Sequence, residues 1–243
     1  MTPEFTTRQI RPIECVKEGF ALIKDEYWML FAISLVGALI AGVSVYVLLG
    51  PMVSGIFICY LKKIDGQKVV FDDLWLGFKY FGKTLLVTIL FVVPLVAYML
   101  GLFMTMYLPL ILQAVGGNRV SDSELWTTFF TALAVDFVIA IVMVCIHSTL
   151  MFAFPLIVDR GMGGWDAIKL SARAALKNMG GVAGLIIVNF CIAVIGELLC
   201  GVGLYLAIPI LTVSNLIAYR KVFPVPSRPT LEPPPPNAYP ELA

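Results

Sequence analysis

The sequence predicts an all-α integral membrane protein, and three observations lead to this fold class. Hydrophobic residues occupy 60% of the 243 positions and charged residues only 14%, compared with about 25% charged residues in soluble domains. Several stretches are longer than the roughly 20 apolar residues that an α-helix needs to cross a bilayer. These stretches are apolar on both faces, whereas the strands of a membrane β-barrel alternate apolar and polar residues.

The positions of the basic residues predict the topology. Sixteen of the 17 Lys and Arg residues lie in four segments, before residue 28, at 62–83, at 160–177 and at 220–228. Because basic residues accumulate in cytoplasmic loops, all four segments and both termini are expected in the cytoplasm. Each apolar stretch between two basic segments must then be a hairpin of two helices, which predicts six transmembrane helices in three hairpins.

An amphipathic stretch with aromatic residues precedes each hairpin and is expected to be a cytoplasmic interfacial helix. The first hairpin is short, since it is confined to the 34 uncharged residues from Trp28 to Leu61; a single long tilted helix, which would give five spans, is the alternative. Together the elements form one transmembrane domain, residues 13–222. In chain order they are a cytoplasmic segment at 1–12, an interfacial helix at 13–26 with spans 28–43 and 45–62, a second at 71–83 with spans 84–107 and 135–158, and a third at 165–178 with spans 181–200 and 203–220.

An internal repeat is a further prediction from the sequence. Gly50–Lys63 aligns without gaps on Ile208–Lys221, which matches a proline with a proline near the start and a basic pair with a basic pair at the end. Three copies of an interfacial helix followed by a hairpin are the simplest organisation that explains this alignment.

The C-terminal segment 223–243 is expected to be a disordered, proline-rich cytoplasmic tail. Eight of the 17 residues from Pro224 to Pro240 are proline, and such a segment favours polyproline II and cannot pack a core. A partner that binds proline motifs in an aromatic groove could recognise it; an inert tail is the alternative.

The third interfacial helix carries Lys169, Arg173 and Lys177 four residues apart, as a stripe beside an apolar face. A helix that lies in the membrane interface has this pattern, with its apolar face in the acyl chains and its cations among lipid phosphates. We therefore predict a site for anionic lipid headgroups, with the candidate residues Arg160, Lys169, Arg173, Lys177, Lys79 and Lys83. The alternative is that these cations only fix topology and depth.

One ionisable residue is expected near the middle of the bilayer. His147 lies 12 residues from the cytoplasmic edge at Asp159, or about 18 Å along a helix, whereas Asp136 and Glu197 are expected near the outer interface. A lone histidine at mid-membrane depth forms hydrogen bonds between helices; a proton relay or a substrate contact is the alternative.

The sequence contains no motif for catalysis, a metal or a cofactor. A zinc protease motif needs two histidines, and this chain has one; its five cysteines include no CxxC pair and are expected to be reduced packing residues. We therefore expect no enzymatic activity, no metal and no cofactor. A net charge of +1 also gives no basis for a nucleic-acid partner.

A resemblance to a known family rests on the segment FAFPLIVDRGMGGWDAIKLSARAALKNMGG and the two apolar helices that follow it. This pattern resembles poorly characterised bacterial polytopic membrane proteins, including the membrane domain attached to some glycerophosphodiester phosphodiesterases. The similarity covers Phe152–Phe223 and, more faintly, Gly50–Lys83. The resemblance implies six helices and a bacterial inner membrane, but no phosphodiesterase domain is present to carry that activity.

The predicted function is therefore that of a non-enzymatic inner-membrane protein. It is expected to organise anionic lipids or partner proteins at the cytoplasmic face, alone or as a homo-oligomer. The alternative is a transporter of a small apolar or amphipathic solute through the helix bundle, which would need a hydrated central cavity containing His147.

Overall fold

The computed structural model describes residues 5–7, 10–115, 121–199 and 201–225. Within these residues the chain is helical and contains no strand, which confirms the all-α prediction. The predicted tail at 223–243 lies outside the described residues from 226 onward.

The helices follow one another with short connections. They are α1 (Pro12–Ile23), α2 (Tyr27–Val43), α3 (Leu49–Ile64), α4 (Phe81–Leu102), α5 (Leu108–Val115), α6 (Asp122–Leu150), α7 (Ala153–Arg160), α8 (Gly164–Lys177), α9 (Met179–Leu198) and α10 (Val202–Val222). Two 3₁₀ segments, η1 (Lys24–Glu26) and η2 (Phe71–Tyr80), and one π-helical segment, η3 (Phe103–Tyr107), lie between them.

Five segments are long and apolar enough to cross a membrane, as expected of a multi-pass membrane protein. They are Pro12–Val43, Phe71–Tyr107, Ser123–Arg160, Met179–Leu198 and Val202–Val222. The remaining predicted span corresponds to α3, which has 16 residues and is therefore about 24 Å long, less than the roughly 30 Å of bilayer hydrocarbon. The sixth crossing thus rests on a short helix.

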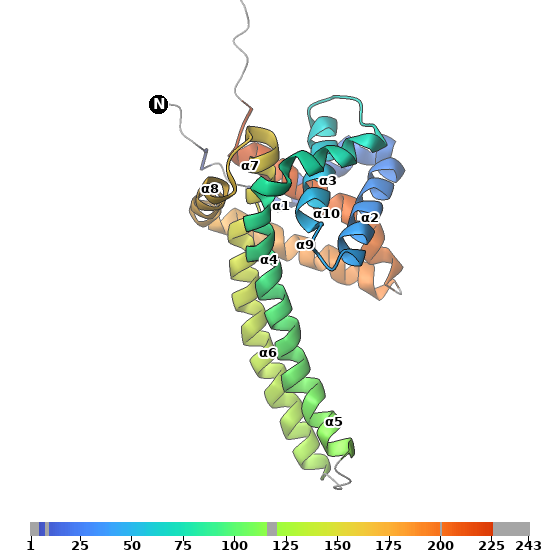
Figure 1. The fold of residues 1–243 in the computed structure, drawn as a ribbon, viewed down its shortest axis with the longest axis vertical. Coiled ribbons are helices and arrows are strands. Elements are labelled where there is room, and N and C mark those ends of the chain that lie inside the picture. The colour runs from blue at the N-terminus through green and yellow to red at the C-terminus, as the bar shows by residue number, and fades with distance from the viewer. Residues whose placement is uncertain (1–4, 8–9, 116–120, 200, 226–243) are drawn as a thin grey trace, which may run out of the picture.

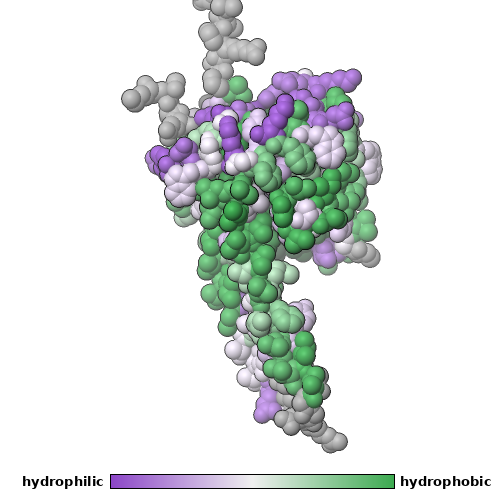
Figure 2. All heavy atoms as spheres, in the orientation of Figure 1, coloured by the Kyte–Doolittle hydropathy of each residue, from purple (hydrophilic) through white to green (hydrophobic). Residues whose placement is uncertain are grey.

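The molecule has two regions of different shape (Figure 1). One, which we call the long hairpin, consists of α4, η3 and α5 lying against α6. The other, the head, contains the remaining helices, and its α2–α3 and α9–α10 hairpins end well short of the far end of the long hairpin. Hydrophilic residues gather on the end of the head that points away from the tip of the long hairpin (Figure 2). We call this end the polar end.

The helix boundaries in the predicted span 135–158 differ from the sequence prediction. Helix α6 begins at Asp122, behind a capping box formed by Ser121 and Glu124, and the chain is interrupted at Met151–Phe152 before α7 begins. Pro155 has no N–H for the carbonyl of Met151, and Ser171 of α8 inserts its hydroxyl here, accepting from Phe152 N at 3.1 Å and donating to Thr149 O at 2.6 Å. Pro155 and the inserted Ser171 hydroxyl together therefore divide this segment into two helices.

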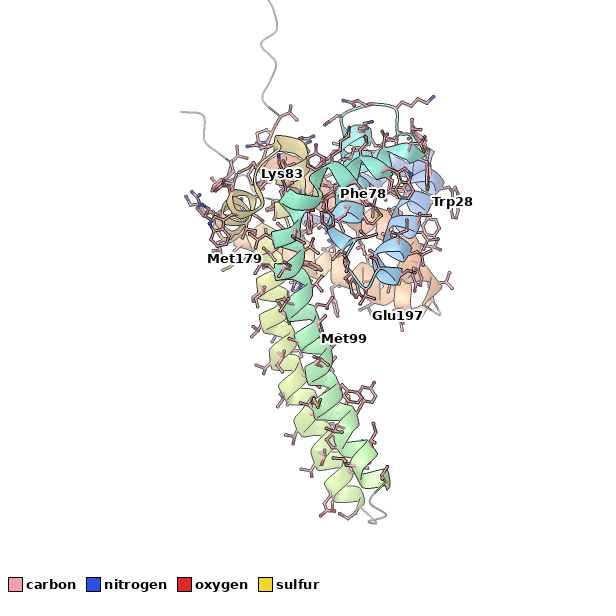
Figure 3. All side chains as sticks on the ribbon, viewed as in Figure 1. Trp28, Phe78, Lys83, Met99, Met179 and Glu197 are labelled. Carbon is pink, nitrogen blue, oxygen red and sulfur yellow. The ribbon has the colours of Figure 1, made fainter. Side chains whose placement is uncertain are left out.

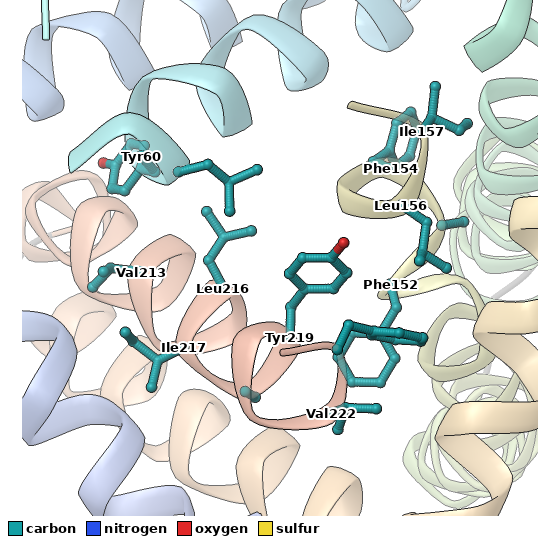
Figure 4. Packing of buried hydrophobic residues seen from close by; sticks show 14 of the residues in the cluster. Tyr60, Phe152, Phe154, Leu156, Ile157, Val213, Leu216, Ile217, Tyr219 and Val222 are labelled. Carbon is teal, nitrogen blue, oxygen red and sulfur yellow. The ribbon is translucent and has the colours of Figure 1, made fainter. Parts of the chain in front are cut away.

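The core of the head lies close to the polar end. Side chains from α3, α7 and α10 meet there (Figure 4), including Tyr60, Phe152 and Tyr219, which are fully buried. The closest backbone approach in the head is between α3 and η2. A Cβ atom on Gly55 would lie 2.0 Å from Leu74 O, and one on Gly77 would lie 2.0 Å from Pro51 O. Only glycine fits at these two positions.

An ion-pair network joins the hairpins at the polar end. Arg220 of α10 donates to Asp65, just after α3, and to Asp159 of α7, each at 2.8 Å. Tyr219 donates to the same Asp159 carboxylate at 2.7 Å. Lys221 pairs with Glu18 of α1 at 3.0 Å. Arg220 and Lys221, the basic pair at the end of α10, therefore connect the ends of all three predicted hairpins. The internal repeat stays a prediction.

Candidate functional site

A large open cavity lies between the start of α1 and the corner where α8 meets α9. Its volume is about 1090 Å³, slightly above the range of about 300–1,000 Å³ for small-molecule sites. Polar, charged and apolar side chains all contribute to its wall. The lining residues are Thr7, Ile10, Arg11, Pro12, Ile13, Glu14, Lys17, Lys177, Asn178, Met179, Gly180 and Gly181.

The N-terminal segment is held in place by the end of α10. Thr6 donates its backbone N–H to Val222 O and its hydroxyl to Lys221 O, each at 2.8 Å. Phe5 lies 6.2 Å from Phe223, ring centre to ring centre, and the ammonium group of Lys177 lies 5.5 Å from the centre of the Phe5 ring. These contacts bring the first described residues next to the α8–α9 corner.

Two glycines of α9 set the distance between α9 and the start of α1. A Cβ atom on Gly181 would lie 2.5 Å from Ile10 Cβ, and one on Gly184 would lie 2.9 Å from Pro12 Cγ. Gly180, by contrast, has no atom within 4 Å of where its Cβ would stand, and it lines the cavity. Gly181 and Gly184 therefore allow the close contact beside the cavity, and Gly180 leaves space within it.

The cavity is positively charged. Three cationic side chains, Arg11, Lys17 and Lys177, face one carboxylate, Glu14, which gives a net charge of +2. Glu14 pairs with Arg11 at 2.9 Å, and its hydrogen bond and negative charge raise the pKa of the Arg11 guanidinium. Because arginine and lysine are the usual partners of phosphate oxygens, the charge and residue types suit a phosphate-bearing ligand.

The six predicted headgroup residues are divided among several places. Lys177 lines the cavity. Lys169 pairs with Asp166 of its own helix at 3.0 Å, and Arg160 lies over the Phe223 ring, 5.1 Å from its centre. The other three are Lys83, which donates to Gly161 O at 2.8 Å, Lys79, which lines a separate depression of about 260 Å³ with Lys62 and Asp65, and Arg173, which is exposed on α8.

Helix α8 buries its small and apolar residues against other helices of the protein. Its buried residues are Ala167, Leu170, Ser171, Ala174 and Ala175, and it packs against α4, α6 and α7. Its apolar face is therefore occupied by protein, not by acyl chains. Trp165 and Leu176 stay exposed beside the cationic stripe, so the outer face still combines apolar and basic groups as an interfacial surface does.

His147 forms contacts within the long hairpin. Its Nε2 lies 3.1 Å from Phe91 O of α4, and its Nδ1 lies 2.9 Å from Met143 O of its own helix. The imidazole also packs edge to face on the Phe91 ring, with 4.3 Å between ring centres. Nearby, Pro94 lacks the N–H that would bond the Leu90 carbonyl. His147 thus links the two helices beside a local defect in α4, which agrees with a hydrogen-bonding role between helices.

The two carboxylates expected near the outer interface have different surroundings. Asp136 of α6 is buried and accepts a hydrogen bond at 3.1 Å from the hydroxyl of Thr105. Thr105 belongs to the π-helical segment η3. Because α6 begins at Asp122, Asp136 lies about 20 Å from the tip of the long hairpin. Glu197 is exposed at the end of α9. Figure 3 places it level with Met99, about halfway along the long hairpin.

Arg11 and Lys17 are site residues that the sequence alone did not single out. They lie more than 150 positions from Lys177, and no local spacing connects them. The predicted repeat could have pointed to Arg11 and Lys17. It places the first interfacial helix, which contains Lys17, and the third, which contains Lys177, on the same side of the molecule. In the described residues, no group of three or more His, Cys, Asp or Glu side chains is placed to hold a metal.

Comparisons with known proteins give little further information. No protein-family model matches the chain, and no solved structure matches it. Uncharacterized proteins of Mycobacterium bovis and Mycobacterium tuberculosis are 32% identical to it over 71 residues, which are 29% of this chain. The matched segment covers 22% of each relative, so the chain spans about a fifth of the length of the curated relatives it matches.

Proposed function

We propose that the chain is a non-enzymatic, multi-pass protein of a bacterial inner membrane that binds and organises anionic lipids at the cytoplasmic face. The observation that carries this proposal is that hydrophilic residues gather at the polar end (Figure 2), where α3, α7 and α10 each end in basic residues. There α8 leaves Trp165, Lys169 and Arg173 exposed. Cations beside exposed apolar side chains at the ends of apolar helices suit the headgroup region of an anionic bilayer.

Two features support an even number of crossings with both termini in the cytoplasm. Helix α3 packs on α2 and returns to the polar end, where Lys63 pairs with Glu26 at 2.9 Å. Thr6 and Val222, bonded at 2.8 Å, bring the two ends of the described chain to the same side. The short α3 fits six spans if its terminal lysines extend to the interface and the bilayer thins locally.

Transport through the bundle has weaker support. It would use His147 in a hydrated cavity, whereas both ring nitrogens of His147 lie against backbone carbonyls. The large cationic cavity is lined by residues of α1, α8 and α9 and does not include His147.

The test is a comparison of two charge-neutralised variants in lipid nanodiscs. Lys169→Gln with Arg173→Gln removes two cations from α8, and Lys24→Gln with Lys68→Gln, both exposed, is the matched control. At about 1 kcal/mol per basic residue near the surface, the α8 pair is expected to weaken anionic-lipid enrichment, measured by native mass spectrometry, roughly 30-fold. Because Lys24 and Lys68 lie on two different segments and not together beside Trp165, the control pair should lose less. Equal losses would show a general attraction with no preference for α8, and no loss in the α8 variant would exclude α8 as a lipid-binding surface.

A further inference from the structure

We propose that the cavity between α1, α8 and α9 binds one anionic phospholipid molecule. Its phosphate would lie among Arg11, Lys17 and Lys177, and its acyl chains would run along the apolar residues at the mouth of the cavity. This inference rests on the proposed function and goes further, because it assigns a single site with defined stoichiometry in place of a diffuse attraction to charged lipid.

The net positive charge of the cavity favours an anion. The guanidinium of Arg11 is shared with Glu14, and the ammonium of Lys177 lies over the ring of Phe5. Lys17 adds a third positive charge to the same wall. A phosphate diester carries one negative charge and two free oxygens, which accept charge-assisted hydrogen bonds from such groups.

The apolar part of the wall favours a lipid over a free anion. Ile13 and Met179 line the cavity and are 61% and 63% exposed. Inorganic phosphate would leave both side chains in water, whereas an acyl chain would cover them. Burying exposed apolar surface contributes about 25 cal/mol per Å². An amphiphilic lipid would therefore contact both the cationic and the apolar residues of the cavity, whereas a small soluble anion would contact only the cationic ones.

The cavity also lies at the right level for a phospholipid headgroup. Met179 is the first residue of a segment that could cross a membrane, Pro12 is the first residue of α1, the predicted interfacial helix, and both line the cavity. A cavity between the start of a membrane-crossing helix and the start of an interfacial helix lies at the boundary between hydrocarbon and water, where lipid phosphates are found. In Figure 3, Met179 lies at this edge, between the polar end of the head and the long hairpin.

Gly180 allows the cavity to be filled without removing any charge. A side chain at this position meets no protein atom within 4 Å of its Cβ, so Gly180→Leu would occupy cavity volume while the fold is kept. Gly82 is an exposed helical glycine with the same free space, and it does not line the cavity. Gly82→Leu is therefore the matched control.

The experiment measures retention of phosphatidylglycerol by the full chain in detergent, using native mass spectrometry. The unmodified protein and Gly82→Leu are each expected to retain one phosphatidylglycerol and to bind phosphatidylcholine at least tenfold more weakly. Gly180→Leu should lower phosphatidylglycerol retention at least tenfold. A second variant, Lys17→Gln with Lys177→Gln, should lower it roughly 30-fold by the loss of two cations. Thermal unfolding of each variant verifies that the fold is kept.

Several outcomes would overturn the proposal. Full retention by Gly180→Leu, or by Lys17→Gln with Lys177→Gln, would show that the lipid is held elsewhere. Competition by glycerol phosphate at the same concentration as phosphatidylglycerol would show that the site takes a soluble anion. In either case the effect of Lys169 and Arg173 on lipid enrichment can persist, so the failure of this cavity is distinguishable from failure of the proposed function.

Discussion

The head and the long hairpin differ in how their apolar side chains are covered. In an apolar 18-residue stretch of α10, 44% of the residues are buried inside the protein, compared with 11% in such a stretch of each of the two segments that contain the arms of the long hairpin. The head has a packed core and the Arg220 ion-pair network, whereas most side chains of the long hairpin depend on surrounding lipid to cover them. The head should therefore resist changes of the bilayer and tolerate few substitutions, and the long hairpin should do the reverse.

The largest difference is expected for the same substitution made in the two regions. Gly77→Ala places a methyl group 2.0 Å from the backbone oxygen of Pro51, and such overpacking should lower the free energy of unfolding by about 3 kcal/mol. Gly101→Ala in α4 meets no atom within 4 Å and should stabilise the helix by up to about 1 kcal/mol. Denaturant unfolding in detergent micelles measures both. Similar values for the two variants would contradict the contrast between the regions.

An intermediate effect is expected from the ion-pair network. Arg220→Met leaves the carboxylates of Asp65 and Asp159 unpaired, and the Arg220 side chain is only 12% exposed. We expect a loss of about 2 kcal/mol, below the 3–5 kcal/mol typical of a fully buried pair.

The control for Arg220 is Lys169→Met, whose side chain is 48% exposed and pairs with Asp166 within the same helix. Exposed pairs of this kind contribute about 0–1 kcal/mol. A cycle of Arg220→Met with Asp159→Asn isolates the pair energy. Additive effects in that cycle would mean that the network does not hold the hairpins together.

The smallest effects are expected from single hydrogen bonds, and here the two regions should agree. Tyr60→Phe removes a 2.9 Å contact with Ser34 in the head, and His147→Phe removes the contact with Phe91 O in the long hairpin. Polar contacts between membrane helices average about 0.6 kcal/mol. Thermal unfolding should therefore change little in either variant. A loss above about 2 kcal/mol for His147→Phe would indicate a role beyond one interhelical bond.

Composition and apolar run length were sufficient to predict the all-α class and several helices able to cross a membrane. The break at Met151–Phe152 also had a visible signal in Pro155, although the inserted Ser171 hydroxyl comes from another helix and could not be predicted locally. The buried face of α8 was harder to predict, because Ala167, Ala174 and Ala175 are only weakly hydrophobic. Their small side chains are buried because α8 packs closely against three neighbouring helices.

The cavity could be predicted only in part, because its walls come from opposite ends of the chain. The stripe that contains Lys177 has a regular spacing, and this spacing singled out one of the cationic residues that line the cavity. Arg11 belongs to the other wall, and its place depends on the pairing of Thr6 with the last turn of α10. Pairings of such large sequence separation leave no periodic pattern in either segment.

The same pairing of Thr6 with Val222, 216 positions apart, has a consequence for biosynthesis. The two arms of the long hairpin are neighbours in the chain and can associate while the ribosome is still translating. The first residues must wait for the last helix to emerge, about 10–40 s later at 5–20 residues per second. During that interval the start of α1 lacks its partner, so the cavity can form only after α10 has been translated.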